Sequence, residues 1–214
     1  VRVGQTAPMH HDGGWHLTGT LGTIAAGVAS ASLMGLDPTK ISYAIGLSAT
    51  QAAGMQQNRG TMAKSFHAGR AASNGILAAL MAHSGYDSSD EIIEGRKGFS
   101  AIYSQKQNYT ALNHNLGQDW MILTNGYKPY ACGIVQHPLI DAMIYLSSMT
   151  NIDAGEIESV KAQIHPHTIK ITGVENPENG LKSKFSLKHS AAVGYIDRQA
   201  GLAQYSDKRA IAQD

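Results

Sequence analysis

The sequence predicts a mainly α-helical protein, with an all-α portion in residues 1–115 and a smaller α+β portion in residues 116–214. Two observations lead to this prediction. The first portion holds long stretches of alanine, glycine and serine, bounded by residues that start or stop helices. In the second portion, a segment that alternates apolar and polar residues, as a half-buried strand does, lies between two amphipathic helical segments. The amino-acid composition and the spacing of apolar residues change near residue 115, where we place the boundary between the two portions.

Three closely packed helices are expected in the first portion. The first covers Thr18–Met34. The second begins at Asp37-Pro38, because aspartate is a favoured N-cap and proline suits the first helical position. The third covers residues 61–84 and is closed by Gly85. Helices so rich in small residues can approach closely, so we interpret five glycines as backbone clearance at helix crossings: Gly19, Gly22, Gly27, Gly69 and Gly75.

The second portion is expected to mix strands and helices. A short strand is predicted at Met121–Leu123, and helices are predicted over His137–Ser148 and Ser186–Asp197. A half-buried strand is predicted over Ile157–Ile164, because its apolar residues recur in an alternating manner. The α+β character of this portion depends on these two strands.

Composition excludes several classes of protein. The 17 basic and 16 acidic side chains leave a net charge of +1, so no nucleic-acid partner is expected. The segment Thr18–Leu36 is uncharged, but it consists mostly of small residues, so we interpret it as a buried helix and expect no membrane span. The single cysteine, Cys132, excludes an intrachain disulfide and a thiolate-bound zinc or iron–sulfur centre. Because the chain begins with Val1 and no signal peptide follows, we expect a segment of a longer cytoplasmic protein.

Candidate metal and nucleotide sites find little support. His10-His11-Asp12 has the residue types of a metal site, but adjacent side chains in a loop point apart, so we interpret it as a solvated loop. His165 and His167 have the spacing for one face of a strand but lack further ligands. No GxGxxG, Walker or GxSxG motif is present. We therefore expect neither a metal nor a cofactor.

The strongest functional signal is a set of isolated basic residues within small, uncharged sequence. His16 directly precedes the first predicted helix, and Lys64 and His67 lie near the start of the third. Lys128 lies in NGYKPYACG and His137 in IVQHPLIDA. A buried lysine needs an anion or a hydrogen-bond partner, whereas a surface lysine with its stem along apolar groups is the alternative for each position taken singly. Together, these residues indicate a pocket for a polycarboxylate anion.

The sequence resembles the MmgE/PrpD family over essentially the whole chain. That family includes 2-methylcitrate dehydratases, cis-aconitate decarboxylase and iminodisuccinate epimerase. The resemblance implies an all-α helical bundle domain plus a smaller α+β lid domain, with the cleft between them. It also implies a homodimer and a longer full-length protein. The segments that carry it are HLTGTLGTIAAG, GTMAKSFHAGRAA, EGRKGFSAIY, KPYACGIVQHPLIDA, IHPHTIKITG and GLKSKFSLKHSAAVGYIDR.

The resemblance also implies the site residues. The histidine of HxTGT is His16, and the lysine of GTMxKxxHAG is Lys64. The lysine of KPYxC, Lys128, borders the same cleft, and Lys184 in SKFS matches a basic position of the lid. We expect Lys64 and Lys128 to hold carboxylates and His16 to act as a polarising donor or general acid/base. Lys184 and His67 are expected to bind substrate, with a structural helix histidine as the alternative for His67.

The function that follows from the resemblance is a metal-independent lyase acting on a small di- or tricarboxylate. We expect dehydration of 2-methylcitrate or a similar hydroxy acid. A decarboxylase or an epimerase on the same fold is an alternative, and so is a non-catalytic carboxylate-binding fragment. Two departures from the family pattern leave the substrate open: Cys132-Gly133 stands where some members have a histidine, and the aspartate-containing helix upstream of HxTGT lies outside this chain.

Overall fold

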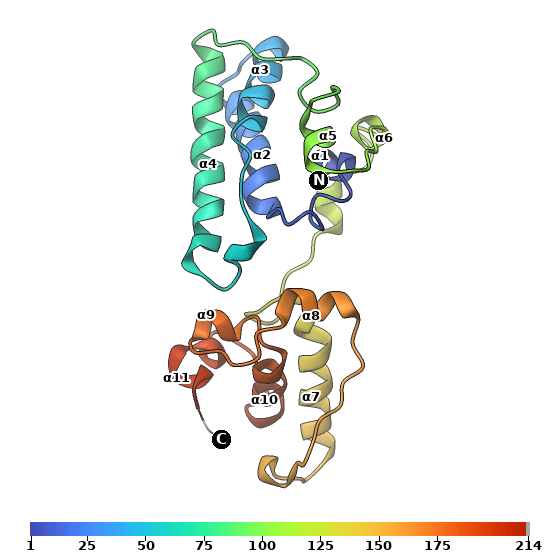
Figure 1. Ribbon diagram of the computed structural model, residues 1–214, viewed down its shortest axis with the longest axis vertical. Helices are drawn as coiled ribbons and strands as arrows, with labels where there is room; N and C mark the ends of the chain where they lie inside the picture. Colours follow the sequence, from blue (N-terminus) through green and yellow to red (C-terminus); the bar gives the residue numbers. More distant parts are fainter. Residues whose placement is uncertain (213–214) are drawn as a thin grey trace. The chain divides into compact units, whose positions relative to one another are not determined.

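The computed structural model describes residues 1–212 and divides the chain into two compact units, Val1–Asn125 and the part from Gly126 onward (Figure 1). Each unit consists of helices joined by loops, and the described residues form no β-strand longer than an isolated bridge. None of the helices described is both long and apolar enough to cross a membrane. The mainly helical class predicted from the sequence is therefore confirmed.

Three helices pack together in the first unit, namely α2 (Leu17–Leu33), α3 (Pro38–Ala49) and α4 (Met62–His83). The predicted start of α3 is confirmed, because the Asp37 carboxylate accepts a hydrogen bond from the backbone N–H of Lys40 at 2.9 Å. In Figure 1, α2 and α4 begin at the same end of this layer, whereas α3 begins at the opposite end. The N-termini of α2 and α4 therefore face the same region of the unit.

Small residues allow these helices to approach closely. A Cβ added at Gly19, Gly27 or Gly75 would lie 2.2, 1.9 or 2.4 Å from the nearest atom of a neighbouring segment, which confirms the predicted clearance at these positions. At Gly22 the nearest atom would be at an ordinary 3.4 Å, and at Gly69 none lies within 4 Å, so that prediction is wrong for Gly69. The space between the helices is filled by a buried alanine cluster: Ala31, Ala44, Ala79 and Ala82.

Shorter elements complete the first unit. They are α1 (Arg2–Thr6), η1 (Gln56–Asn58), α5 (Phe99–Tyr103), α6 (Thr110–Asn113) and η2 (Met121–Thr124). A second hydrophobic cluster joins Ala7, which precedes α2, to Ile24 of α2, Ala49 of α3 and Phe99 of α5. This cluster anchors the chain that precedes α2, and therefore fixes where α2 begins.

His10 lies in the core of the first unit and is only 1% exposed. Its ring contacts Phe99 and Tyr103, with ring centroids 5.3 and 5.0 Å away. Neither ring nitrogen has a hydrogen-bond partner among the described residues. Burial, followed by the charge of neighbouring His11, lowers the pKa of His10 from 6.5 to about 4. The interpretation of this stretch as a solvated loop is therefore wrong for His10.

The His10→Phe variant should be more stable than the wild type at pH 7 and less sensitive to acid. Between pH 6.5 and about 4 the unfolded chain binds a proton at His10 that the folded chain excludes, so the free energy of unfolding falls as the pH falls through this window. The shift corresponds to a loss on the order of 3 kcal/mol. Phenylalanine removes this loss and two unpartnered buried nitrogens. Urea unfolding at pH 7 and pH 4.5 measures both effects, and equal acid sensitivity of the two proteins would contradict the assignment.

The second unit is built around α7 (His137–Met149) and α10 (Leu187–Ile196), which pack against each other. Both predicted helices are confirmed, and Ser186 caps α10 by accepting a hydrogen bond from the backbone N–H of His189. Buried Ile140 and Val193 form the core with Cys132, Ala200 and Tyr205. The remaining elements are η3 (Ile134–Gln136), η4 (Ala154–Glu156), α8 (Pro166–Thr172), α9 (Gly180–Ser183), η5 (Ala203–Tyr205) and α11 (Asp207–Ala210).

The two predicted strands do not form. The first lies in η2, and residues 157–164 have no regular secondary structure. A strand needs a neighbour whose backbone groups complete the hydrogen-bond ladder, and the described residues provide none. The alternating residues Ile157, Val160 and Ala162 instead line an apolar groove of about 400 Å³, together with residues of α7 and α10. The α+β character predicted for the second portion is therefore absent from its described residues.

Candidate functional site

His16 is held at the start of α2 by a loop that precedes α4. Its backbone N–H donates to the carbonyl of Gly54 at 3.0 Å, and Trp15 and Met55 form an antiparallel bridge beside this bond. The loop can come this close because Gly19 has no side chain, whereas a Cβ there would lie 2.2 Å from the loop's backbone oxygen. As the N-cap of α2, His16 has an extended backbone and an imidazole that makes no capping bond.

His16 and His67 form a direct pair. His67 lies in the second turn of α4, is 9% exposed, and places its Nδ1 2.8 Å from Nδ1 of His16. The ring centroids are 5.0 Å apart. Because α2 and α4 begin at the same end of the unit, residues that are 51 positions apart in the chain meet here.

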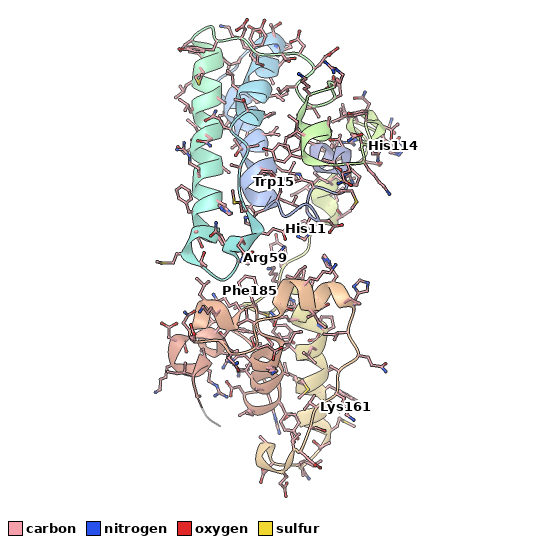
Figure 2. All side chains as sticks on the ribbon, viewed as in Figure 1. His11, Trp15, Arg59, His114, Lys161 and Phe185 are labelled. Atoms are coloured by element: carbon pink, nitrogen blue, oxygen red, sulfur yellow. The ribbon has the colours of Figure 1, made fainter. Side chains whose placement is uncertain are left out.

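Two cationic side chains lie around this histidine pair. Lys64 is in the first turn of α4, and Arg59 lies between η1 and α4. The Arg59 guanidinium donates from Nη2 to Nε2 of His11 at 2.9 Å, which leaves the other ring nitrogen of His11 to carry the proton. Figure 2 shows His11 and Arg59 at the end of the unit where α2 and α4 begin.

The electrostatic environment at the end of the first unit where α2 and α4 begin favours binding of an anion. Burial is the largest cause that lowers the pKa of His16 from 6.5 to about 4, and the charges of His67, Lys64, Arg59 and His11 contribute to the same shift in that order. The imidazole of His16 is therefore neutral at pH 7, next to two permanent positive charges. The N-termini of two long helices add their partial positive charge to the same region. A carboxylate placed here would neutralise these charges beside an imidazole that can take or give a proton.

A groove of about 390 Å³ opens beside His67, and its lining does not include His16, Lys64 or Arg59. It lies between α2, α4 and the loop that holds His16, and its lining includes Gly54, His67, Arg70 and Asn74. The rise of an α-helix places Asn74 about 10 Å along α4 from His67. This length and volume suit a small organic acid.

Lys128 and Lys184 lie together within the second unit. Lys128 Nζ donates to the carbonyl of Cys132 at 3.3 Å, and the carbonyl of Lys184 accepts from the backbone N–H of Gly133 at 3.1 Å. Burial raises the pKa of the Cys132 thiol, while both lysines act in the opposite direction, which places their charges around this thiol. The second unit thus has its own basic cluster.

The sequence-predicted residues therefore fall into two groups. The structure brings His16, Lys64 and His67 together in the first unit, and Lys128 and Lys184 together in the second. Sequence reasoning missed Arg59 and His11, which complete the first group. A signal was present for Arg59, because it is a second isolated cation in the turn directly before the helix that carries Lys64.

The histidines of the HPH motif have a different role from the one predicted. His165 is the N-cap of α8, and its Nδ1 accepts a hydrogen bond from the backbone N–H of His167 at 3.2 Å. The strand face on which we placed both rings does not exist, because a helix begins between them. Within residues 1–212, no three histidine, cysteine, aspartate or glutamate side chains gather as a metal site.

Known proteins with similar sequences include several curated relatives. A cis-aconitate decarboxylase of Aspergillus terreus is 29% identical over 210 residues, covering 91% of this chain and 43% of the relative. A cis-aconitate decarboxylase-like protein of Aspergillus oryzae is 32% identical over 139 residues, which is 61% of this chain and 29% of that protein. Human cis-aconitate decarboxylase is 30% identical over 90 residues, 42% of this chain and 19% of its own. The chain thus spans less than half the length of these relatives.

Both parts of the chain match one family. Residues 1–112 match the MmgE/PrpD N-terminal domain, and residues 130–214 match the MmgE/PrpD C-terminal domain. The first match contains the pair formed by His16 and His67, and the second contains Lys184, whereas Lys128 lies two residues before the second match begins. The chain therefore belongs to the MmgE/PrpD family.

Proposed function

We propose that the protein is a metal-independent lyase acting on a small di- or tricarboxylate. The observation that carries this proposal is the gathering of His16, Lys64 and Arg59 where α2 and α4 begin, with His16 neutral among positive charges. The family relatives named as decarboxylases support the reaction class. The single cysteine supports a route without an iron–sulfur cluster, since protein-held clusters use several thiolates.

The roles follow from the chemistry of carbon acids. Removal of a proton next to a carboxylate places negative charge on that carboxylate, and preorganised cations stabilise this charge. Lys64 and Arg59 hold the carboxylate, and His16 takes the proton. Burial is the largest cause of the low pKa of His16, and the nearby positive charges add to it. A bound carboxylate offsets these charges, so substrate binding raises this pKa from about 4 toward the neutral range, where a general base is most effective.

Two substrates fit this scheme. The first is 2-methylcitrate or a similar hydroxy acid, from which the proton and the adjacent hydroxyl leave as water. The second is an unsaturated tricarboxylate that loses carbon dioxide, and the relatives named as cis-aconitate decarboxylases favour it. Both reactions build negative charge next to a bound carboxylate, so the same cluster serves either one.

The remaining parts of the proposal concern the second unit and the assembly. Lys128 and Lys184 are proposed as carboxylate-binding groups of their own unit, because their charges converge around Cys132. The protein is further proposed to be a cytoplasmic homodimer. Size-exclusion chromatography with light scattering on the full-length protein tests the dimer.

Incubation of the full-length protein with 2-methylcitrate, citrate, cis-aconitate and iminodisuccinate, followed by NMR, tests the proposed reaction. Loss of water from a hydroxy acid supports dehydration, and loss of carbon dioxide from cis-aconitate supports decarboxylation. Saturable binding of these acids without conversion would contradict the lyase and identify a carboxylate-binding protein. Neither binding nor conversion would contradict the proposal as a whole.

The Lys64→Met variant should bind the carboxylate substrate about ten- to a hundred-fold more weakly, the usual worth of a charge-assisted hydrogen bond. Methionine keeps the length of the stem and removes the charge. Folding should be unharmed, because Lys64 adds positive charge to a region that already contains Arg59. Titration calorimetry and thermal unfolding of the full-length variant measure the two effects.

The matched control is Lys40→Met, because Lys40 occupies the same third position of its helix, α3, which begins at the opposite end of the layer. This control should bind substrate like the wild type. A steep loss of stability in Lys64→Met with unchanged activity per folded molecule would show that Lys64 is structural.

A further inference from the structure

The hydrogen bond between His16 and His67 constrains their protons. The two Nδ1 atoms lie 2.8 Å apart, and a hydrogen bond between two imidazole nitrogens requires that one carries a proton and the other a lone pair. A second proton between the rings would place two donors face to face and break the bond. The pair therefore holds one proton between its rings.

The position of this proton decides what His16 can do. If Nδ1 of His16 donates, its Nε2 on the far side of the ring has a free lone pair and is a base. If Nδ1 of His16 accepts, Nε2 carries the proton and is a donor. The partner on one side of the ring thus sets the chemistry on the other side.

We propose that His67 is a positioning residue that accepts the Nδ1 proton of His16 and so keeps Nε2 of His16 as the base. This inference rests on the proposed function for the identity of the reaction, but the hydrogen bond itself does not depend on it. Besides His67, the groups that face His16 are Lys64 on α4, Arg59 before α4, and His11, whose Nε2 accepts from Arg59. Lysine and arginine have no acceptor, so neither cation can accept the Nδ1 proton of His16.

In a dehydration, the two histidines take up and give back the same number of protons. Nε2 of His16 takes the substrate proton, the electrons of the C–H bond remain on carbon, and the Nδ1 proton of His16 moves to Nδ1 of His67. His16 is then neutral with its proton on Nε2. The electron pair on carbon forms the C=C bond as the neighbouring C–O bond breaks, the Nε2 proton passes to the departing hydroxyl to form water, and His67 returns its proton to Nδ1 of His16. Both rings end as they began.

The experiment compares the wild type with His67→Leu and His67→Asn in the full-length protein. Leucine removes the hydrogen-bond partner, whereas the asparagine oxygen can occupy the place of Nδ1 and accept the proton. With ¹⁵N-labelled histidine, NMR at pH 7 should show His16 protonated at Nδ1 and unprotonated at Nε2, both in the wild type and in His67→Asn. In His67→Leu, this tautomer should lose its predominance.

Kinetics provide the second readout. In His67→Leu, kcat should fall about 10- to 100-fold with little change in KM, the usual cost of removing the group that orients a functional histidine. The acidic limb of the kcat/KM profile should move to lower pH, because an acceptor at His67 stabilises the protonated form of His16 and leucine removes this stabilisation. His67→Asn should recover most of kcat.

The possible failures are distinguishable. If NMR finds the wild-type His16 bare at Nδ1, or finds the same tautomer in His67→Leu, the inference is overturned whatever the activity. If no carboxylate is converted but the tautomers behave as described, the hydrogen-bond inference holds and the proposed function fails.

Discussion

The His16→Asn variant should lose turnover by about 10²- to 10⁴-fold, the range that a positioned general base contributes. The asparagine amide can take the place of Nδ1 and keep the bond to His67, which is 2.8 Å long in the wild type. The variant lacks only the outer ring nitrogen, which is the atom that takes the proton. Substrate affinity should change little, because Lys64 and Arg59 are the groups proposed to hold the carboxylate. Steady-state kinetics of the full-length protein separates kcat from KM.

His83→Asn is the matched control for this variant. His83 is the last residue of α4, is exposed, and lies at the opposite end of the helix from His67. The same chemical change there should leave turnover unchanged. If His16→Asn retains the activity of the wild type, His16 is not the base, and the proposed mechanism must be abandoned.

The Gly75→Ala variant should lower the free energy of unfolding by about 1–3 kcal/mol or more. The added Cβ would lie 2.4 Å from Cβ of Ala26 and 2.5 Å from the backbone nitrogen of Gly27. These atoms belong to α2 and cannot rotate away, so α2 and α4 must move apart. The same movement would separate His16 from His67. Thermal unfolding measures the stability, and the histidine NMR spectrum measures the pair.

Gly69→Ala is the control within the same helix. No atom lies within 4 Å of a Cβ at this position, so alanine should stabilise α4 by up to about 1 kcal/mol through its higher helix propensity. The two substitutions are chemically identical and are predicted to have opposite signs. A stable Gly75→Ala protein would show that the contact between α2 and α4 can relax.

Local signals were sufficient for the helices. The start of α3 at Asp37-Pro38 and the cap of α10 at Ser186 depend on hydrogen bonds between neighbours in the chain, so the sequence alone predicts them. The same holds for the family resemblance, whose motifs named His16 and Lys64 and also included His67. The resemblance named candidate residues without showing how they meet.

Contacts between distant residues could not be predicted in this way. The bond from His16 to His67 and the bond from Arg59 to His11 join residues that are 51 and 48 positions apart. They exist because α2 and α4 begin at the same end of the unit and because glycines let the connecting loop approach. Neither the low pKa of His16 nor its tautomer follows from its local sequence, since both depend on burial and on these neighbours.

The sequence by itself determined the helical class, the helix starts and stops, and the residue types of the site. Only the tertiary structure decided which residues share a site and what becomes of residues 157–164. Their alternating pattern is compatible with a strand, but a strand forms only when a second backbone lies beside it to complete the hydrogen bonds. Here the apolar residues line a groove beside α7 and α10. Helices complete their hydrogen bonds within one segment, and for this reason the predicted helices form whereas the predicted strands do not.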